Sequence, residues 1–122
     1  MKSEERRAVV EAFLDAWGRA DVDALMSLMA EDCVYLVSTG PGPGSTVTGA
    51  QQLREVFAGM TATETEVETR EGRIWIAGEH AFAEWSYDEI QDDGQINEVR
   101  GIDVIHIVDG LIRTIDAYRK SY

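Results

Sequence analysis

Apolar residues in the first half of the chain recur at intervals of three and four positions. In the segment 3–18 this spacing brings five apolar residues to one face: Val9, Val10, Phe13, Leu14 and Trp17. Such a face is typical of an amphipathic α-helix that packs on a core. Similar spacing predicts a short second helix after Asp21 and a third helix after Thr48-Gly49-Ala50-Gln51, whose residue types fit a capping box.

From position 61 onward the pattern alternates with a period of two, which predicts β-strands. In the segment 61–70 the acidic residues Glu64, Glu66 and Glu68 alternate with threonine and valine, so we expect a strand with one solvated acidic face. Further strands are predicted at 73–77, 80–91, 96–108 and 111–118, with turns at 92–95 and 109–110. An earlier strand is predicted at 33–37. The glycine- and proline-rich segment 40–44 after it is either a rim of a pocket or a plain connection.

Three helices followed by an antiparallel meander, with one extra early strand, indicate an α+β fold in a single domain, 1–122. Both faces of the predicted strand 96–108 are mainly apolar. Asp103 and Ile105 share one face, and Val104 and His106 share the other. One face covers the helices, whereas the other needs a second cover, so we expect a homodimer that forms through this outer face.

The charge of the chain excludes several classes of partner. It has 23 acidic residues against 11 basic residues, a formal net charge of −12 over 122 residues. Nucleic acids and anionic membranes require Lys and Arg at their phosphates, so neither is an expected partner. The hydrophobic content of 44% and the three tryptophans are typical of a folded domain with a core.

The sequence shows no targeting segment and no metal-binding motif. No apolar stretch follows the charged N-terminus, and no run reaches the roughly 18–20 apolar residues of a membrane span, so we expect a soluble cytoplasmic protein. The single cysteine, Cys33, excludes an internal disulfide. His80 and His106 lack metal-ligand spacing. We therefore expect neither a metal nor a cofactor.

Asp103 is the main candidate for chemistry because it is isolated among isoleucines and valines. Burial in such surroundings raises the pKa of a carboxyl group. A neutral carboxylic acid can donate a proton or a hydrogen bond to an oxygen of a substrate. The alternative is that Asp103 pairs with Arg100, His80 or a tyrosine and only closes the sheet.

Aromatic residues are the candidate wall of a ligand pocket: Phe13, Trp17, Tyr35, Trp85 and Tyr87. Tyr35 and Tyr87 also carry hydroxyl groups that need partners when buried. A two-residue turn at Asp93-Gly94 would pair Asp103 with Glu84 and bring polar residues to its face. One additional residue in the turn would instead bring Trp85 and Tyr87 to that face. We expect the aromatic face, because burial of several polar side chains without partners is costly.

Three segments resemble the nuclear transport factor 2-like superfamily: FLDAWGRADVDAL at 13–25, AEDCV at 30–34 and RGIDVIHIVDGLI at 100–112. That superfamily includes ketosteroid isomerases, SnoaL-like polyketide cyclases, limonene epoxide hydrolases and scytalone dehydratases. The resemblance implies a cone, in which a curved antiparallel sheet wraps around three helices and encloses an apolar pocket. It also implies a dimer through the outer sheet face.

The resemblance also constrains the chemistry. Compared with ketosteroid isomerases, Asp103 stands where a protonated aspartic acid donates to an oxyanion. Phe13, however, replaces the tyrosine donor, and Leu36-Val37-Ser38 stands where the aspartate base would be. Steroid isomerisation by that mechanism is therefore not expected.

Limonene epoxide hydrolases need an Arg-x-Asp pair and a further aspartate on the last strand. The nearest positions here are Trp85-Ser86-Tyr87 and Ala117, with Asp116 one step out of phase. Because one step along a strand reverses the direction of a side chain, epoxide hydrolysis by that triad is also not expected.

Two hypotheses follow. The first is a small cofactor-independent enzyme of isomerase, cyclase, dehydratase or hydrolase type, acting on an apolar oxygenated molecule. Asp103 would transfer the proton, and Ile105 and Ala117 would line the pocket with the aromatic residues. The second is a dimeric binding or interaction module without turnover, for which no pocket above about 300 Å³ is expected beside Asp103.

Overall fold

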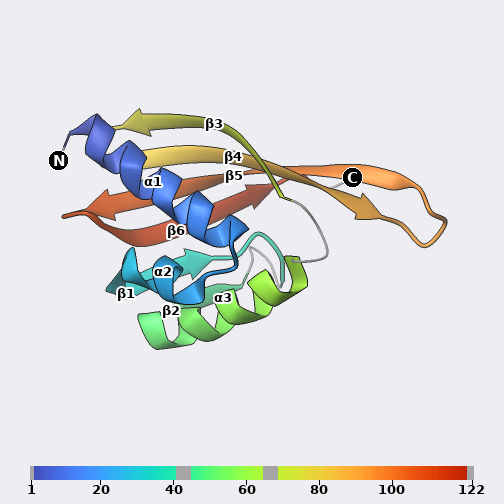
Figure 1. The fold of residues 1–122 in the computed structure, drawn as a ribbon, viewed down its shortest axis with the longest axis horizontal. Coiled ribbons are helices and arrows are strands. Elements are labelled where there is room, and N and C mark those ends of the chain that lie inside the picture. Colours follow the sequence, from blue (N-terminus) through green and yellow to red (C-terminus); the bar gives the residue numbers. More distant parts are fainter. Residues whose placement is uncertain (1, 41–44, 65–68, 121–122) are drawn as a thin grey trace.

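The computed structural model describes residues 2–40, 45–64 and 69–120. Three helices and six strands follow one another along these residues. The helices are α1 (Ser3–Gly18), α2 (Val22–Ser27) and α3 (Ala50–Glu64), and the strands are β1 (Met29–Leu36), β2 (Thr46–Thr48), β3 (Arg70–Ala77), β4 (His80–Ile90), β5 (Ile96–Val108) and β6 (Leu111–Arg119). The helices lie together on one side of a curved sheet (Figure 1). The predicted α+β fold is confirmed.

The six strands form one sheet in the order β2-β1-β6-β5-β4-β3. Strands β3 to β6 are the predicted antiparallel meander. Strand β1 joins it by pairing with β6 in parallel, and the short strand β2, which was not predicted, pairs antiparallel with β1. The sheet is therefore mixed, with its first long strand beside its last.

Different helices cover different ends of the sheet. Helix α1 packs on β3 and β4, α3 packs on β1 and β2, and α2 lies against both helices (Figure 1). The largest fully buried side chains between these layers come from every helix and from β1, β5 and β6: Phe57, Leu25, Leu53, Ile105, Ile107, Ile112, Ile115, Val10 and Cys33. Burial of one such side chain contributes about 1.5–3 kcal/mol.

The predicted starts of the second and third helices are supported by capping contacts. The Asp21 carboxylate accepts a hydrogen bond from the Ala24 backbone N–H at 3.1 Å. This bond lowers the pKa of Asp21. At α3 the side-chain oxygen of Gln52 accepts from the Thr48 N–H at 3.1 Å. The reciprocal contact of the predicted capping box is thus made by Gln52 and not by Gln51.

The strand predicted from position 61 is wrong at its start, because residues 61–64 continue α3. Thr61 is buried, and its hydroxyl donates to the Phe57 carbonyl at 2.7 Å, one helical turn earlier. The threonine thus satisfies its polar group inside a helix. The predicted acidic face (Glu64, Glu66 and Glu68) and positions 41–44 of the predicted loop lie outside the described side chains.

The turn between β4 and β5 decides which side chains face the helices. Gln91 N–H donates to Gln95 C=O at 2.8 Å, so Asp92, Asp93 and Gly94 form a three-residue turn. Gly94 has φ of 82°, the left-handed conformation that such turns require at their last position. As a result Asp103 pairs with Ala83 and not with Glu84. The predicted aromatic register is confirmed.

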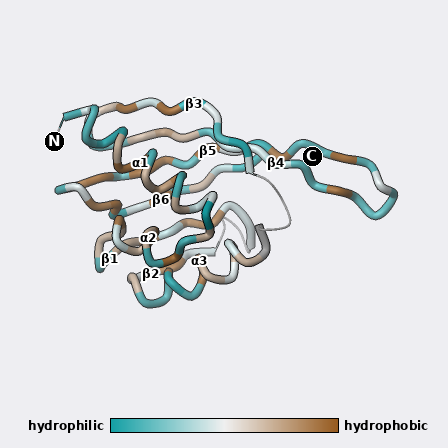
Figure 2. Tube along the Cα trace, viewed as in Figure 1, coloured by the Kyte–Doolittle hydropathy of each residue, from teal (hydrophilic) through white to brown (hydrophobic). Residues whose placement is uncertain are grey.

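The outer face of the sheet is partly apolar, and none of the three helices in the described ranges packs on it. Trp75 pairs with Phe82, which pairs with Val104 on the next strand. Trp75 is 43% exposed, and Phe82 and Val104 are half-buried. Beyond the body, the β4–β5 hairpin continues as an arm along which hydrophobic residues interrupt a mainly hydrophilic stretch of chain (Figure 2).

Candidate functional site

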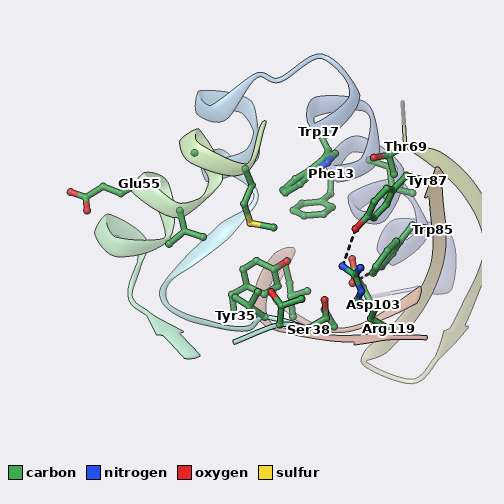
Figure 3. Close-up of a pocket in the computed structure, with 18 residues that line it drawn as sticks. Phe13, Trp17, Tyr35, Ser38, Glu55, Thr69, Trp85, Tyr87, Asp103 and Arg119 are labelled. Atoms are coloured by element: carbon green, nitrogen blue, oxygen red, sulfur yellow. Dashed lines mark hydrogen bonds between the residues drawn. The ribbon is translucent and has the colours of Figure 1, made fainter. Parts of the chain in front are cut away.

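A cavity with a volume of about 580 Å³ lies between α1, α3 and the inner face of the sheet. Seven of the predicted site residues line it: Phe13, Trp17, Tyr35, Trp85, Tyr87, Asp103 and Ala117. They come from α1, β1, β4, β5 and β6, so the tertiary fold is what brings them together. Figure 3 shows Phe13, Trp17 and Tyr87 around this space. Ile105 does not line the cavity, because it is fully buried behind the wall.

Aromatic rings form the helical side of this cavity. Phe13 and Trp17 lie one turn apart on α1, with ring centroids 6.0 Å apart. Phe57 of α3, which is fully buried, contacts both rings and also Tyr35, at centroid distances of 5.4–6.1 Å. Edge and tilted contacts of this kind favour one fixed arrangement of rings. Phe57 therefore supports the wall from behind.

Asp103 lies on the sheet side of the cavity, anchored by Trp85. The indole Nε1–H of Trp85 donates to Oδ1 of Asp103 at 3.0 Å, and Asp103 is half-buried. Arg100, an alternative partner predicted from the sequence, points to the other face and lies 3.9 Å from Glu98. Glu55, the other acidic residue among the described lining residues, points away from the aromatic rings (Figure 3).

Arg119 is a lining residue that the sequence analysis missed. It follows Ala117 by two positions on β6, and alternation places both side chains on the same face. Its Nη1–H donates to the Tyr87 hydroxyl at 2.9 Å, and its Nη2–H donates to Glu89 at 3.1 Å. Ala117 became a candidate through the comparison with limonene epoxide hydrolases, and alternation along the same strand is the signal that could have added Arg119.

The polar residues that the other register would have placed inside lie on the outer face. Glu84 binds Arg73 at 2.9 Å, and this hydrogen bond lowers the pKa of the Glu84 carboxyl. Asp88 binds Arg70 at 2.8 Å, and its pKa is lowered for the same reason. Both carboxylates are thus paired with arginines outside the cavity.

The remaining predicted groups lie away from the cavity. His106 stacks on His80 with ring centroids 4.6 Å apart and approaches Glu79 at 3.4 Å. Cys33 is fully buried, and this burial raises the pKa of its thiol. Within residues 2–40, 45–64 and 69–120, no group of three metal-ligating side chains comes together. Nor does any helix in these ranges have the length and hydropathy to cross a membrane.

The sequence matches the SnoaL-like domain over residues 10–115. The chain belongs to the SnoaL-like domain family. No curated protein matches it. The matched range contains the three segments that resemble the nuclear transport factor 2-like superfamily: 13–25, 30–34 and 100–112. The chain has the nuclear transport factor 2-like fold.

Solved structures agree with this assignment. An NTF2-like protein of unknown function from Mesorhizobium loti is 28% identical, with a TM-score of 0.83 over 99% of this chain and 95% of that chain. A candidate SnoaL-like polyketide cyclase from Jannaschia is 15% identical, with a TM-score of 0.78 over 96% and 86%. A candidate ketosteroid isomerase from Kribbella flavida is 18% identical, with a TM-score of 0.76 over 98% and 80%. At these identities the last two comparisons establish the fold alone.

Proposed function

We propose that the cavity binds an apolar small molecule that carries an oxygen, and that Asp103 transfers a proton to or from it. The observation that carries this proposal is the position of Asp103: a half-buried carboxyl group in the wall of an aromatic cavity, fixed by the Trp85 indole. Aromatic rings supply apolar contact area, and one positioned carboxyl group supplies acid–base chemistry.

The volume of the cavity favours a small ligand over an interaction module. The cavity of about 580 Å³ exceeds the roughly 300 Å³ at which ligand sites begin. The fold is shared with proteins named as candidate polyketide cyclases and ketosteroid isomerases, and many relatives have no known function. This likeness is consistent with acid–base chemistry but does not identify the reaction.

The simplest reaction that fits is proton exchange next to a carbonyl group. As a carboxylate, Asp103 takes a proton from the carbon beside the C=O. The C–H electrons then form a C=C bond, and the C=O electrons move to the oxygen. As the resulting carboxylic acid, Asp103 returns a proton to carbon and the carbonyl re-forms. Both half-reactions balance without another reactant.

Hydrogen–deuterium exchange tests this proposal without knowledge of the natural substrate. Cyclohexanone, 1-tetralone and 2-acetylphenanthrene are incubated with the protein in D₂O, and loss of the α-proton signal is followed by NMR. We expect exchange of at least one ketone, slowed about 100-fold or more by Asp103→Asn, the range for loss of general acid–base catalysis. Asn keeps an oxygen for the Trp85 N–H.

Asp116→Asn is the matched control. Asp116 lies on β6 one residue from Ala117 and pairs with Val104, so its side chain lies on the outer face. It therefore undergoes the same chemical change outside the cavity and retains exchange. Equal exchange by wild type and Asp103→Asn, or no exchange of any of the three ketones, would contradict the proposal.

We further propose that a second copy of the chain covers the outer face of the sheet. The cross-strand row Trp75, Phe82 and Val104 is apolar and exposed or half-buried in the single chain. Helices α1, α2 and α3 lie on the opposite side of the sheet (Figure 1). Burial of such a row in a symmetric interface removes apolar surface from water on both copies at once.

A further inference from the structure

Among the described residues, the Tyr87 hydroxyl is used as a hydrogen-bond acceptor and not as a donor. Its oxygen accepts the Nη1–H of Arg119 at 2.9 Å. A guanidinium group has donors and no acceptor, so the Tyr87 proton must point elsewhere. Among the residues that the structure describes, no group accepts that proton. The O–H group is thus available to a ligand in the cavity that Tyr87 lines.

Tyr87 and Arg119 each make a further contact that holds the side chain in place. Arg119 also donates to Glu89 at 3.1 Å, and its side chain is only 23% exposed. The Tyr87 ring stacks on Trp85, with centroids 6.1 Å apart and planes 12° apart. The Tyr87 side chain is therefore held both at its ring and at its oxygen (Figure 3). A donor that is held in this way needs little reorganisation to bind a ligand.

Trp85, the neighbouring donor, differs from Tyr87. Its single N–H is already used by Asp103 at 3.0 Å. A hydroxyl that accepts a charge-assisted hydrogen bond is also a better donor than a free hydroxyl. Of these two adjacent donors in the wall, Tyr87 is the one left to bind a ligand oxygen.

We propose that Tyr87 donates a hydrogen bond to the carbonyl oxygen of the ligand, with Arg119 as its positioning residue. The substrate class is therefore an apolar carbonyl compound. This inference rests on the proposed function for the use of the cavity but not for turnover. When Asp103 removes the adjacent proton, the carbonyl oxygen gains negative charge, and the Tyr87 hydrogen bond becomes stronger at that point.

The ¹³C chemical shift of a bound carbonyl carbon tests the hydrogen bond directly. The three ketones, each labelled with ¹³C at the carbonyl, are titrated with the 122-residue protein. We expect a downfield shift on binding to wild type, because donation to the oxygen polarises the C=O bond. Tyr87→Phe abolishes that shift and weakens binding by about 3- to 10-fold, the effect of one neutral hydrogen bond.

Two Arg119 variants separate positioning from simple packing. Arg119→Met removes the donor to Tyr87 and reduces the downfield shift, whereas Arg119→Lys keeps a donor and restores most of it. A residue that only supports the fold would change the amount of ligand bound without changing the ¹³C chemical shift of the bound carbonyl. If that shift is the same in wild type, Arg119→Met and Arg119→Lys, Arg119 has no positioning role.

Tyr118→Phe is the matched control, since Tyr118 is 57% exposed outside this cavity and donates to Asp116. It leaves the carbonyl shift unchanged. Loss of the shift in Tyr35→Phe in place of Tyr87→Phe, or no downfield shift in wild type for any bound ketone, overturns the inference.

The two proposals fail separately. A ketone that shows the Tyr87-dependent shift without α-proton exchange refutes proton transfer by Asp103 and retains the inference. Exchange that depends on Asp103 without a Tyr87-dependent shift refutes the Tyr87 hydrogen bond and retains proton transfer by Asp103. If none of the three ketones binds, both proposals are wrong.

Discussion

The indole ring of Trp85 occupies the space where any other residue at position 101 would place its side chain. A Cβ atom built on Gly101 would lie 2.2 Å from Cζ2 of Trp85, and the two residues are direct cross-strand partners. The same indole donates to Asp103. The absence of a side chain at position 101 therefore leaves the space that the Trp85 indole needs to reach Asp103.

Gly101→Ala displaces Trp85 and destabilises the protein. Overpacking of this kind costs about 1–3 kcal/mol, and the displaced indole no longer reaches Asp103. Urea denaturation measures the loss of stability, and the ketone titration measures the weaker binding. Gly18→Ala is the control, since nothing lies within 4 Å of its Cβ position. Equal stability of Gly101→Ala and wild type would show that Trp85 has room to move.

The Cys33 thiol should resist alkylation in the folded protein. It is fully buried, and burial raises its pKa above the ordinary value of about 8.5. Iodoacetamide at that pH is expected to leave the native thiol unmodified and to modify it in guanidinium chloride. Mass spectrometry distinguishes the two states. Fast labelling of the native protein would contradict the buried position.

The raised pKa of the Cys33 thiol also predicts how the stability of the protein changes with pH. Because the folded pKa is the higher one, the contribution of Cys33 is fully present below about pH 8.5 and is lost as pH rises toward the folded pKa. Unfolding midpoints of wild type should therefore fall more steeply above that pH than those of Cys33→Ala. Parallel curves would exclude this linkage.

The Glu84–Arg73 pair predicts an effect at acidic pH. The hydrogen bond from Arg73 lowers the pKa of Glu84, so the contribution of this carboxylate is present above about pH 4.3 and is lost as pH falls through the folded pKa. We expect Glu84→Gln to lower the thermal midpoint at neutral pH and to match wild type at the acid end. Glu11→Gln, an exposed change on α1, serves as the control. A difference that does not depend on pH would refute the assignment.

The proposed dimer predicts a mass near twice 13.6 kDa by light scattering at micromolar concentration. Trp75→Glu places a charge in the apolar row of the outer face and should give monomers. Because Trp75 is 43% exposed, the substitution should leave the fold intact, as circular dichroism can show. Ala8→Glu on the exposed side of α1 keeps the dimer. A monomeric wild type would reject the proposal.

The amphipathic elements could be predicted from the sequence because each has one clear period. The helical period identified α1, the turn signals at 92–95 and 109–110 marked the ends of β4 and β5, and the cost of burying Glu84 indicated the correct register. The alternating pattern after position 60 wrongly predicted a strand at 61–64, because threonine is compatible with both the helical period and the strand period. Leu53, Phe57 and Thr61 are spaced by four, and this spacing was the signal for a longer helix.

Two features depend on pairing between distant segments and could not be read from a local pattern. The parallel pairing of β1 with β6 joins Tyr35 to Ile115, two positions that no sequence period connects. The contact between Arg119 and Tyr87 bridges two strands that are not neighbours in the sheet, since β5 lies between β4 and β6. The aromatic residues of the site and the face that Arg119 occupies were thus predictable, whereas the hydrogen bond between Arg119 and Tyr87 was not.

The β1–β6 pairing also bears on the order in which the chain acquires its binding site. Strands β3 to β6 are joined by short turns, whereas β1 must close a loop from Met29 to Ile112 before it pairs with β6. Closure of a long loop costs more entropy than formation of a hairpin, and such contacts are slow to form. Tyr35 reaches the cavity only through this closure. A ligand that contacts Tyr35 and Tyr87 together therefore binds only the completely folded chain, and by mass action it raises the unfolding midpoint as its concentration increases.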